Sequence, residues 1–180
     1  MIDQMVKDVM CRLRPSYYAS CAALESFRWQ ADLMDSKSKR KIVNGARQSG
    51  KSTTVASLPC WEARFYPRSL SVVAAATEKQ AIEDLNRIKA YAAKDPHLKV
   101  IRSSDELLEF SNGSRILVVT ASERSARGWS APRLILLDEA SRIPDEVYVA
   151  IRPMLTKNPD CTMVVISTPN GREGFFYRAW

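Results

Sequence analysis

The chain has 180 residues, of which 46% are hydrophobic, and its formal net charge is +7 at pH 7. A chain of this length can bury a core without disulfides or metal ions, so a single α/β domain is the first expectation. The apolar runs are far shorter than the roughly 20 residues that cross a bilayer. The start of the chain also lacks a signal-peptide core, so a soluble, non-secreted protein is predicted.

The cysteines and the charge add two further expectations. The four cysteines form no CxxC pair and His97 is the single histidine, which leaves too few ligands for a zinc site or a disulfide framework. Reduced thiols are therefore expected. The positive charge favours polyanionic partners, but the basic residues are scattered apart from a cluster at 37–41, so charge alone leaves nucleic-acid binding open.

The N-terminal segment, about residues 1–38, is predicted to be mainly helical. Apolar residues recur at helical spacing within 2–35, and Trp29–Met34 is a short amphipathic stretch. From about residue 39 to 180, predicted strands and helices alternate, which is typical of an α/β core. The N-terminal segment and this core are expected to form one domain, residues 1–180. No internal repeat or long linker divides the chain.

The core begins with a strand at Lys41–Asn44 that leads into a loop with two glycines. The next stretch, Lys51–Phe65, has the composition of a helix that ends before Pro67. A β-branched and alanine-rich run at Leu70–Ala76 predicts a second buried strand.

The middle of the chain carries a helix start and a hairpin turn. Thr77 and Gln80 have the spacing of a capping box, which predicts a helix running to about Ala93. The stretch LLEFSNGSRILVV then alternates apolar and polar residues on both sides of Asn112 and Gly113, a strong signal for a tight turn. We therefore expect an antiparallel hairpin inserted into the alternating pattern.

The last third continues the pattern of strands and helices. LILLD, residues 134–138, is continuously apolar up to its last residue and suits a strand that is buried on both faces. A short helix near Asp145–Arg152 and a buried strand at Met163–Ser167 follow. The whole chain thus predicts a mostly parallel central sheet with helices on both faces.

The stretch GARQSGKST, residues 45–53, has the GxxxxGKS spacing of a phosphate-binding loop between a predicted strand and a predicted helix. Glycines let the backbone wrap closely around phosphate oxygens, and the helix start adds a partial positive charge. Lys51 would neutralise the β- and γ-phosphates, and the hydroxyl of Ser52 would bind Mg²⁺. The candidate nucleotide-binding residues here are Gly45, Ala46, Arg47, Gln48, Ser49, Gly50, Lys51, Ser52 and Thr53.

An acidic pair ends the LILLD strand. At the carboxyl end of a buried parallel strand, Asp138 can hold Mg²⁺ through water, and Glu139 can orient and deprotonate an attacking water. The alternative is that both residues cap the next helix. The glycine loop upstream favours the first interpretation, because both motifs follow strands that open on the same edge of the sheet.

Hydrolysis also needs a positive group for the charge that develops in the transition state. Arg47 lies inside the glycine loop, and Arg127 lies in the segment SERSARGWSAP before the acidic strand. Either arginine could supply that charge. The alternative for each is a surface or DNA-facing arginine.

Together these motifs resemble the ATPase domain of the large terminase subunit, the DNA-packaging motor of tailed bacteriophages. The resemblance spans about residues 15–180 and is carried by FRWQADL, VNGARQSGKST, FSNGSRI, SARGWSAPRLILLDEA and VISTPNGREGFFY. It implies a P-loop NTPase of the ASCE/RecA-like type. The cofactors that it implies are ATP and Mg²⁺.

The resemblance also assigns roles that the residues alone do not. Gln30 would read the adenine edge, with Trp29 or nearby residues packing on the base. Ser167 and Thr168, followed by Pro169, match the coupling motif, which is expected on a strand between the glycine-loop strand and the acidic strand. Arg127 matches an arginine proposed to reach into the next subunit's site.

The partners implied by the resemblance are double-stranded DNA, a homo-oligomeric ring of this subunit, the portal and the small terminase subunit, in the host-cell cytoplasm. The nuclease domain of large terminases is not expected in this chain. A helicase core domain is an alternative, although helicases place their arginine finger on a second core domain. A non-catalytic, nucleotide-dependent binding module is another, and Glu139 argues against it.

Overall fold

The computed structural model describes residues 2–22, 25–122, 129 and 131–180. The described N-terminal part forms short helices, α1 (Ile2–Leu13), α2 (Pro15–Cys21) and α3 (Arg28–Asp35). The first break falls at Arg14, just before Pro15, which occupies the first turn of α2, where its missing N–H costs no hydrogen bond. The segment that the sequence analysis treated as broadly helical is therefore divided into separate helices.

The central sheet has seven strands among the described residues, in the order β1-β7-β6-β2-β5-β4-β3. From β1 to β5 in this order, neighbouring strands pair in parallel, whereas β4 and β3 are antiparallel and form one edge. The strands are β1 (Arg40–Asn44), β2 (Leu70–Ala75), β3 (Val100–Ser103), β4 (Leu107–Phe110), β5 (Arg115–Thr120), β6 (Leu134–Asp138) and β7 (Thr162–Ser167). The predicted mostly parallel sheet is confirmed.

The predicted hairpin is also confirmed, as β4 and β5. Gly113 in its turn has φ 79°, a left-handed conformation that suits glycine. The second strand of the hairpin also pairs in parallel with β2, so the hairpin extends the main sheet. β3, which the sequence analysis did not identify, pairs with β4 at the edge.

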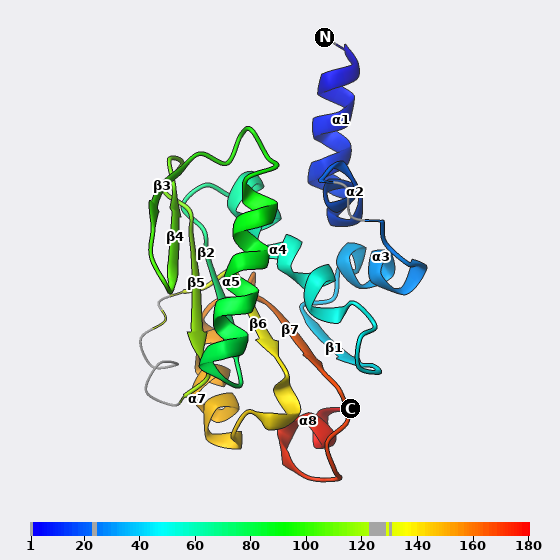
Figure 1. Cartoon of the computed structure of the whole chain (residues 1–180), viewed down its shortest axis with the longest axis vertical. Coiled ribbons are helices and arrows are strands. Elements are labelled where there is room, and N and C mark those ends of the chain that lie inside the picture. Colours follow the sequence, from blue (N-terminus) through cyan, green and yellow to red (C-terminus); the bar gives the residue numbers. More distant parts are fainter. Residues whose placement is uncertain (1, 23–24, 123–128, 130) are drawn as a thin grey trace.

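Helices cover both faces of the sheet (Figure 1). One face packs against α4 (Lys51–Phe65) and α5 (Glu78–Ala92), and the other packs against α7 (Asp145–Lys157) and α8 (Gly174–Ala179). The residues of β6 are all buried, with alternate side chains in the two apolar clusters. Strand β6 is therefore covered on both faces, as its sequence predicts.

The capping box predicted at the start of α5 is only half formed. Thr77 Oγ1 accepts a hydrogen bond from the backbone N–H of Gln80 at 3.2 Å. The amide nitrogen of Gln80, however, donates to the carboxylates of Asp84 and Asp138. Because a carboxylate is a stronger acceptor than a neutral group, these two acids determine where the Gln80 amide points.

The N-terminal helices pack against the outer side of α4. Trp61 Nε1 on α4 donates to the carbonyl of Cys11 at 2.8 Å. Arg64 Nη1 lies 2.6 Å from Asp95 Oδ1, and Tyr18 Oη donates to the other oxygen of this carboxylate at 3.0 Å.

None of the described helices is both long and apolar enough to cross a membrane.

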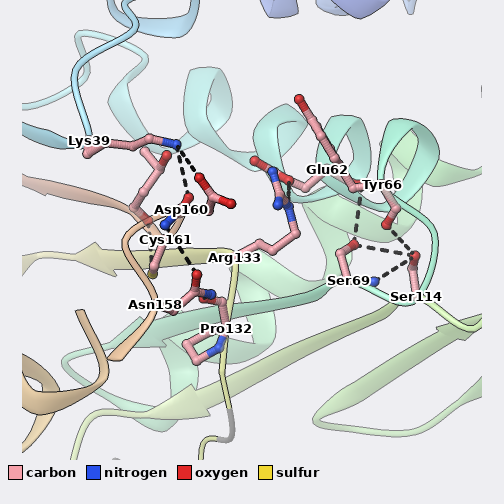
Figure 2. A network of polar contacts seen from close by, with 11 residues as sticks. Lys39, Glu62, Tyr66, Ser69, Ser114, Pro132, Arg133, Asn158, Asp160 and Cys161 are labelled. Carbon is pink, nitrogen blue, oxygen red and sulfur yellow. Dashed lines mark hydrogen bonds and ion pairs between the residues drawn. The ribbon is translucent and has the colours of Figure 1, made fainter. Parts of the chain in front are cut away.

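A polar network fixes the beginning of β6, at the opposite end of the strand from Asp138 (Figure 2). Arg133 Nε donates to Glu62 Oε2 on α4 at 3.1 Å, and the Arg133 guanidinium lies 3.8 Å from the ring centroid of Tyr66. Asn158 Nδ2 donates to the carbonyl of Pro132 at 2.9 Å. The Arg133 contacts hold β6 against α4, the helix that begins at the glycine loop, and the Asn158 contact ties the same segment to the end of α7.

Candidate active site

The carboxyl ends of the parallel strands open on a cleft of about 550 Å³. The glycine loop and the residues after β6 and β7 meet there, as the sequence analysis expected. The lining residues are Arg47, Gln48, Ser49, Gly50, Lys51, Ser52, Thr53, Ala76, Thr77, Gln80, Arg87, Glu139, Arg142 and Thr168. The two motifs on which the functional interpretation depends therefore share one site.

The glycine loop connects β1 to α4, which begins at Lys51 as predicted. Its first amide, Gly45 N, donates to the carbonyl of Ser167 at 3.1 Å and so ties the loop to β7. Gln48 and Gly50 have φ values of 60° and 77°. A Cβ on Gly50 would lie 2.9 Å from Gln30 Nε2, so both the backbone conformation and the close contact favour glycine here.

Lys51 points into the loop and is only 7% exposed. Its Nζ donates to the carbonyl oxygens of Gly45, at 2.8 Å, and Ala46, and lies 3.3 Å from Thr168 Oγ1. A phosphate oxygen is a stronger acceptor for an ammonium group than a carbonyl oxygen is. Lys51 is thus placed where a bound phosphate could take over its hydrogen bonds.

The two predicted metal residues are in direct contact. Ser52 Oγ donates to Asp138 Oδ2 at 2.8 Å, and the backbone N–H of Glu139 donates to Asp138 Oδ1 at 2.9 Å. A hydroxyl and a carboxylate are hard oxygen ligands that suit Mg²⁺, which takes its other ligands from phosphate and water. No cluster of three or more His, Cys, Asp or Glu side chains that could hold a metal occurs in the described parts of the chain.

Glu139 follows β6 and lines the cleft next to the glycine loop. Its backbone is left-handed, with φ 52° and ψ 41°, a conformation that costs a residue with a side chain about 1–2 kcal/mol. The strand before Glu139 is fully buried. The carbonyl of Glu139 accepts a hydrogen bond from Arg142 N at 2.9 Å. This backbone turn directs the Glu139 side chain into the cleft instead of into the sheet.

The coupling-motif residues lie where the resemblance implies. β7 is between β1 and β6, Ser167 is its last residue, and Thr168 follows at the cleft. Ser141 N donates to Ser167 Oγ at 3.0 Å, and Ser141 Oγ donates to the Thr168 carbonyl at 3.0 Å. Ser141, which the sequence analysis missed, thus joins the coupling motif to the segment that carries Glu139.

Helix α5 contributes polar residues that the sequence analysis also missed. Gln80 and Arg87 line the cleft, and Asp84 lies between them on the helix. Asp84 Oδ1 accepts hydrogen bonds from Gln80 Nε2 at 3.2 Å and from Arg87 Nη1 at 2.8 Å. Burial and the nearby charge of Asp138 raise the pKa of Asp84 to about 7. The i, i+3 and i+4 spacing on one helix face is the signal that could have identified this group.

The remaining predicted site residues are Gln30, Trp29, Arg127 and Arg47, of which Arg47 lines the cleft. Gln30 is 4% exposed. Its side-chain oxygen accepts a hydrogen bond from Phe27 N at 2.7 Å, and its side-chain nitrogen donates one to Thr54 Oγ1. Neither Gln30 nor Trp29 lines the cleft, so their contacts with adenine stay predictions. Arg127 lies outside the described residues, and its role also stays a prediction. Arg47 is exposed at the mouth of the cleft.

The fold and the position of the cleft define a P-loop NTPase domain of the RecA-like class. Residues 42–180 match the family described as the N-terminal part of the terminase large subunit, T4likevirus-type. The chain belongs to this family.

Solved structures from phage packaging proteins share the fold. The large terminase ATPase domain of Thermus phage P74-26 matches with a TM-score of 0.78 and 25% identity, covering 92% of this chain and 74% of that one. The HK97 bacteriophage large terminase matches with a TM-score of 0.65 and 18% identity over 80% of this chain and 33% of that one. The large terminase of a thermophilic bacteriophage, in complex with ADP, has a TM-score of 0.58 and 13% identity, over 79% and 37% of the two chains.

Proposed function

We propose that this chain is the ATP-hydrolysing motor domain of a genome-packaging terminase, which drives double-stranded DNA into a procapsid. The contact between Ser52 and Asp138 carries this proposal, because the two residues proposed to bind magnesium lie together beside the glycine loop. Membership of the terminase large-subunit family supports the packaging role. The thermophilic-phage terminase with bound ADP supports a nucleotide in the cleft.

Each side chain then has a defined task. The loop amides and Lys51 hold the β- and γ-phosphates, and Ser52 with Asp138 would hold Mg²⁺, which supplies positive charge to the phosphate oxygens when bound. Glu139 accepts a proton from water as the water oxygen attacks the γ-phosphorus. The bond from this phosphorus to the bridging oxygen breaks, and ADP leaves with the electron pair.

The coupling route starts at Thr168, whose hydroxyl lies 3.3 Å from Lys51 Nζ. A γ-phosphate that draws Lys51 away from the loop carbonyls also changes this contact. Ser141 bridges Thr168 to the Glu139 segment, so loss of the phosphate can be transmitted to both strands at once. Double-stranded DNA, a ring of identical subunits, the portal and the small terminase subunit are the partners in this proposal.

Magnesium-dependent ATP hydrolysis by the chain, with and without double-stranded DNA, tests the proposal directly. Glu139→Gln should bind ATP but hydrolyse it at least about 100-fold more slowly, because the general base is lost. Equal hydrolysis by the variant and the unmodified chain would contradict the role of Glu139. Separation of duplex strands by the chain alone would favour the helicase alternative instead.

A mixing experiment tests the ring and the arginine that would act between subunits. Glu139→Ala and Arg127→Ala proteins should each be nearly inactive. The mixture should regain ATP hydrolysis, because one interface in the ring can pair an intact carboxylate with an intact arginine. Absence of recovery at concentrations where the unmodified chain is active would show that Arg127 does not act in trans.

A further inference from the structure

Gln80 lies between the magnesium carboxylate of the active site and a second, buried carboxylate. Its Nε2 donates to Asp138 Oδ2 at 3.1 Å and to Asp84 Oδ1 at 3.2 Å. An amide nitrogen has two protons, so each carboxylate receives one of them. The bond to Asp138 spans 58 positions in the sequence, whereas the bond to Asp84 lies within one turn of α5.

Asp138 is held by donors from three different elements. Ser52 at the start of α4 and Gln80 on α5 both donate to Oδ2, while the backbone N–H of Glu139 donates to Oδ1. Two donors on one oxygen and one on the other fix the rotation of the carboxylate about its last bond. A hydroxyl that binds a metal through a lone pair can still donate its proton, so Ser52 could act both as a metal ligand and as a donor to Asp138. Gln80, in contrast, donates to Asp138 without being placed among the metal ligands.

The position of Asp84 is hard to explain by packing alone. Asp84 is 4% exposed, and its Oδ2 is buried without a hydrogen-bond partner among the described residues. A buried carboxylate oxygen without a partner is costly to the folded state. Gln80, in contrast, lines the open cleft and is not needed to fill the core. The arrangement weakens the fold and orders the amide beside Asp138.

We propose that Gln80 is a positioning residue that orients Asp138 for magnesium, and that Asp84 fixes the direction of the Gln80 amide. This role rests on the proposed function, because it takes Asp138 as the magnesium carboxylate. Outer residues that orient a metal ligand affect metal affinity or activity by about 10-fold to 100-fold when they are removed. Gln80 therefore acts through Asp138 and touches neither the nucleotide nor the metal.

The test replaces Gln80 by methionine, which has a similar length and helix propensity but no N–H donor. Lys79→Met is the matched control, since Lys79 is its exposed neighbour on α5 and does not line the cleft. Binding of Mn²⁺ to the ADP-saturated protein is measured from the free Mn²⁺ signal in electron paramagnetic resonance. Gln80→Met should bind Mn²⁺ at least about 10-fold more weakly, with ADP affinity in EDTA unchanged, and Lys79→Met should match the unmodified chain.

The outcomes separate the positioning role from the proposed function. If the unmodified chain binds neither ADP nor Mn²⁺, the proposed function fails and the role of Gln80 fails with it. If the unmodified chain binds both and Gln80→Met binds Mn²⁺ equally well, only the positioning role is overturned. Loss of ADP binding in EDTA by a folded Gln80→Met protein would also overturn it, because Gln80 would then be acting on the nucleotide.

Asp84→Asn gives a second arm that does not depend on the folding of Gln80→Met. Asparagine keeps the size of the side chain but weakens the acceptor that holds the Gln80 amide, so Mn²⁺ affinity should fall. In the Gln80→Met background the same change should have a smaller effect, because the amide it orients is gone. Equal effects in the two backgrounds would show that Asp84 acts through its charge alone.

Discussion

The hydroxyl of Ser52 lies 2.8 Å from the carboxylate of Asp138, although 86 positions separate the two residues in the sequence. Ser52 lies in the first turn of α4, directly after the glycine loop that follows β1, and Asp138 is the last residue of β6, with β7 between β1 and β6. Parallel strands that end on one edge bring these side chains together. The contact is the basis of the proposed magnesium site.

Asp138→Asn should uncouple nucleotide binding from the metal. The variant keeps a side chain of the same size but loses the negative charge that attracts Mg²⁺, so ADP affinity should depend less on Mg²⁺ than in the unmodified chain. ADP affinity in EDTA should change little. Titration of a fluorescent ADP analogue with Mg²⁺ and with EDTA measures this difference. An unchanged Mg²⁺ dependence would contradict the assignment of Asp138.

The left-handed backbone at Glu139 leads to a separate prediction about stability. Glu139→Gly should be more stable than Glu139→Ala by about 1 kcal/mol, because glycine adopts a positive φ without the steric cost of a Cβ atom. Both variants should lose hydrolysis equally, since both lack the carboxylate. Urea unfolding compares the two free energies of unfolding. Equal stabilities would indicate that the backbone relaxes when the glutamate is removed.

Local sequence patterns predicted most of the fold and the centre of the site. The glycine loop and the acidic pair are short motifs, and the bounds predicted for α4 agree with the structure. β3 was missed because its residues are all exposed, so Val100 and Ile101 show no alternation with a buried face. Gln80 and Ser141 were missed because their contacts with Asp138 and Ser167 exist only once separate elements have come together.

The raised pKa of Asp84 leads us to predict that stability depends on pH. The pKa of Asp84 is raised to about 7, first by burial and then by the charge of Asp138, so in the folded state it keeps a proton that the unfolded chain releases. The folded state therefore binds more protons between about pH 4 and 7, and this group makes stability fall as pH rises through that range. Asp84→Asn removes the titrating group.

The gain in the free energy of unfolding from Asp84→Asn should consequently be larger at pH 8 than at pH 5, by more than about 1 kcal/mol. Urea unfolding in EDTA at the two pH values measures it. Glu78→Gln serves as the control, because Glu78 is exposed on the same helix, and it should show no such difference. A gain that is the same at both pH values would contradict a raised pKa for Asp84.

Gly50 and Gly171 form a matched pair for testing how tightly the glycine loop packs on Gln30. Both have a left-handed backbone, with φ values of 77° and 80°. A Cβ on Gly50 would lie 2.9 Å from Gln30 Nε2, whereas a Cβ on Gly171 would have no atom within 4 Å. Alanine at either position pays the backbone cost of about 1 kcal/mol, but only Gly50→Ala must also displace the Gln30 amide.

Gly50→Ala should therefore be the more destabilising change in urea unfolding. The Gln30 amide cannot move freely, because Phe27 N and Thr54 Oγ1 hold its two ends. In a Gln30→Ala background the extra cost of Gly50→Ala should largely disappear, since the contact is absent. Equal losses in the free energy of unfolding for Gly50→Ala and Gly171→Ala would mean that the Gln30 amide moves aside easily. Gln30 would need the same freedom of movement to reach the edge of an adenine base.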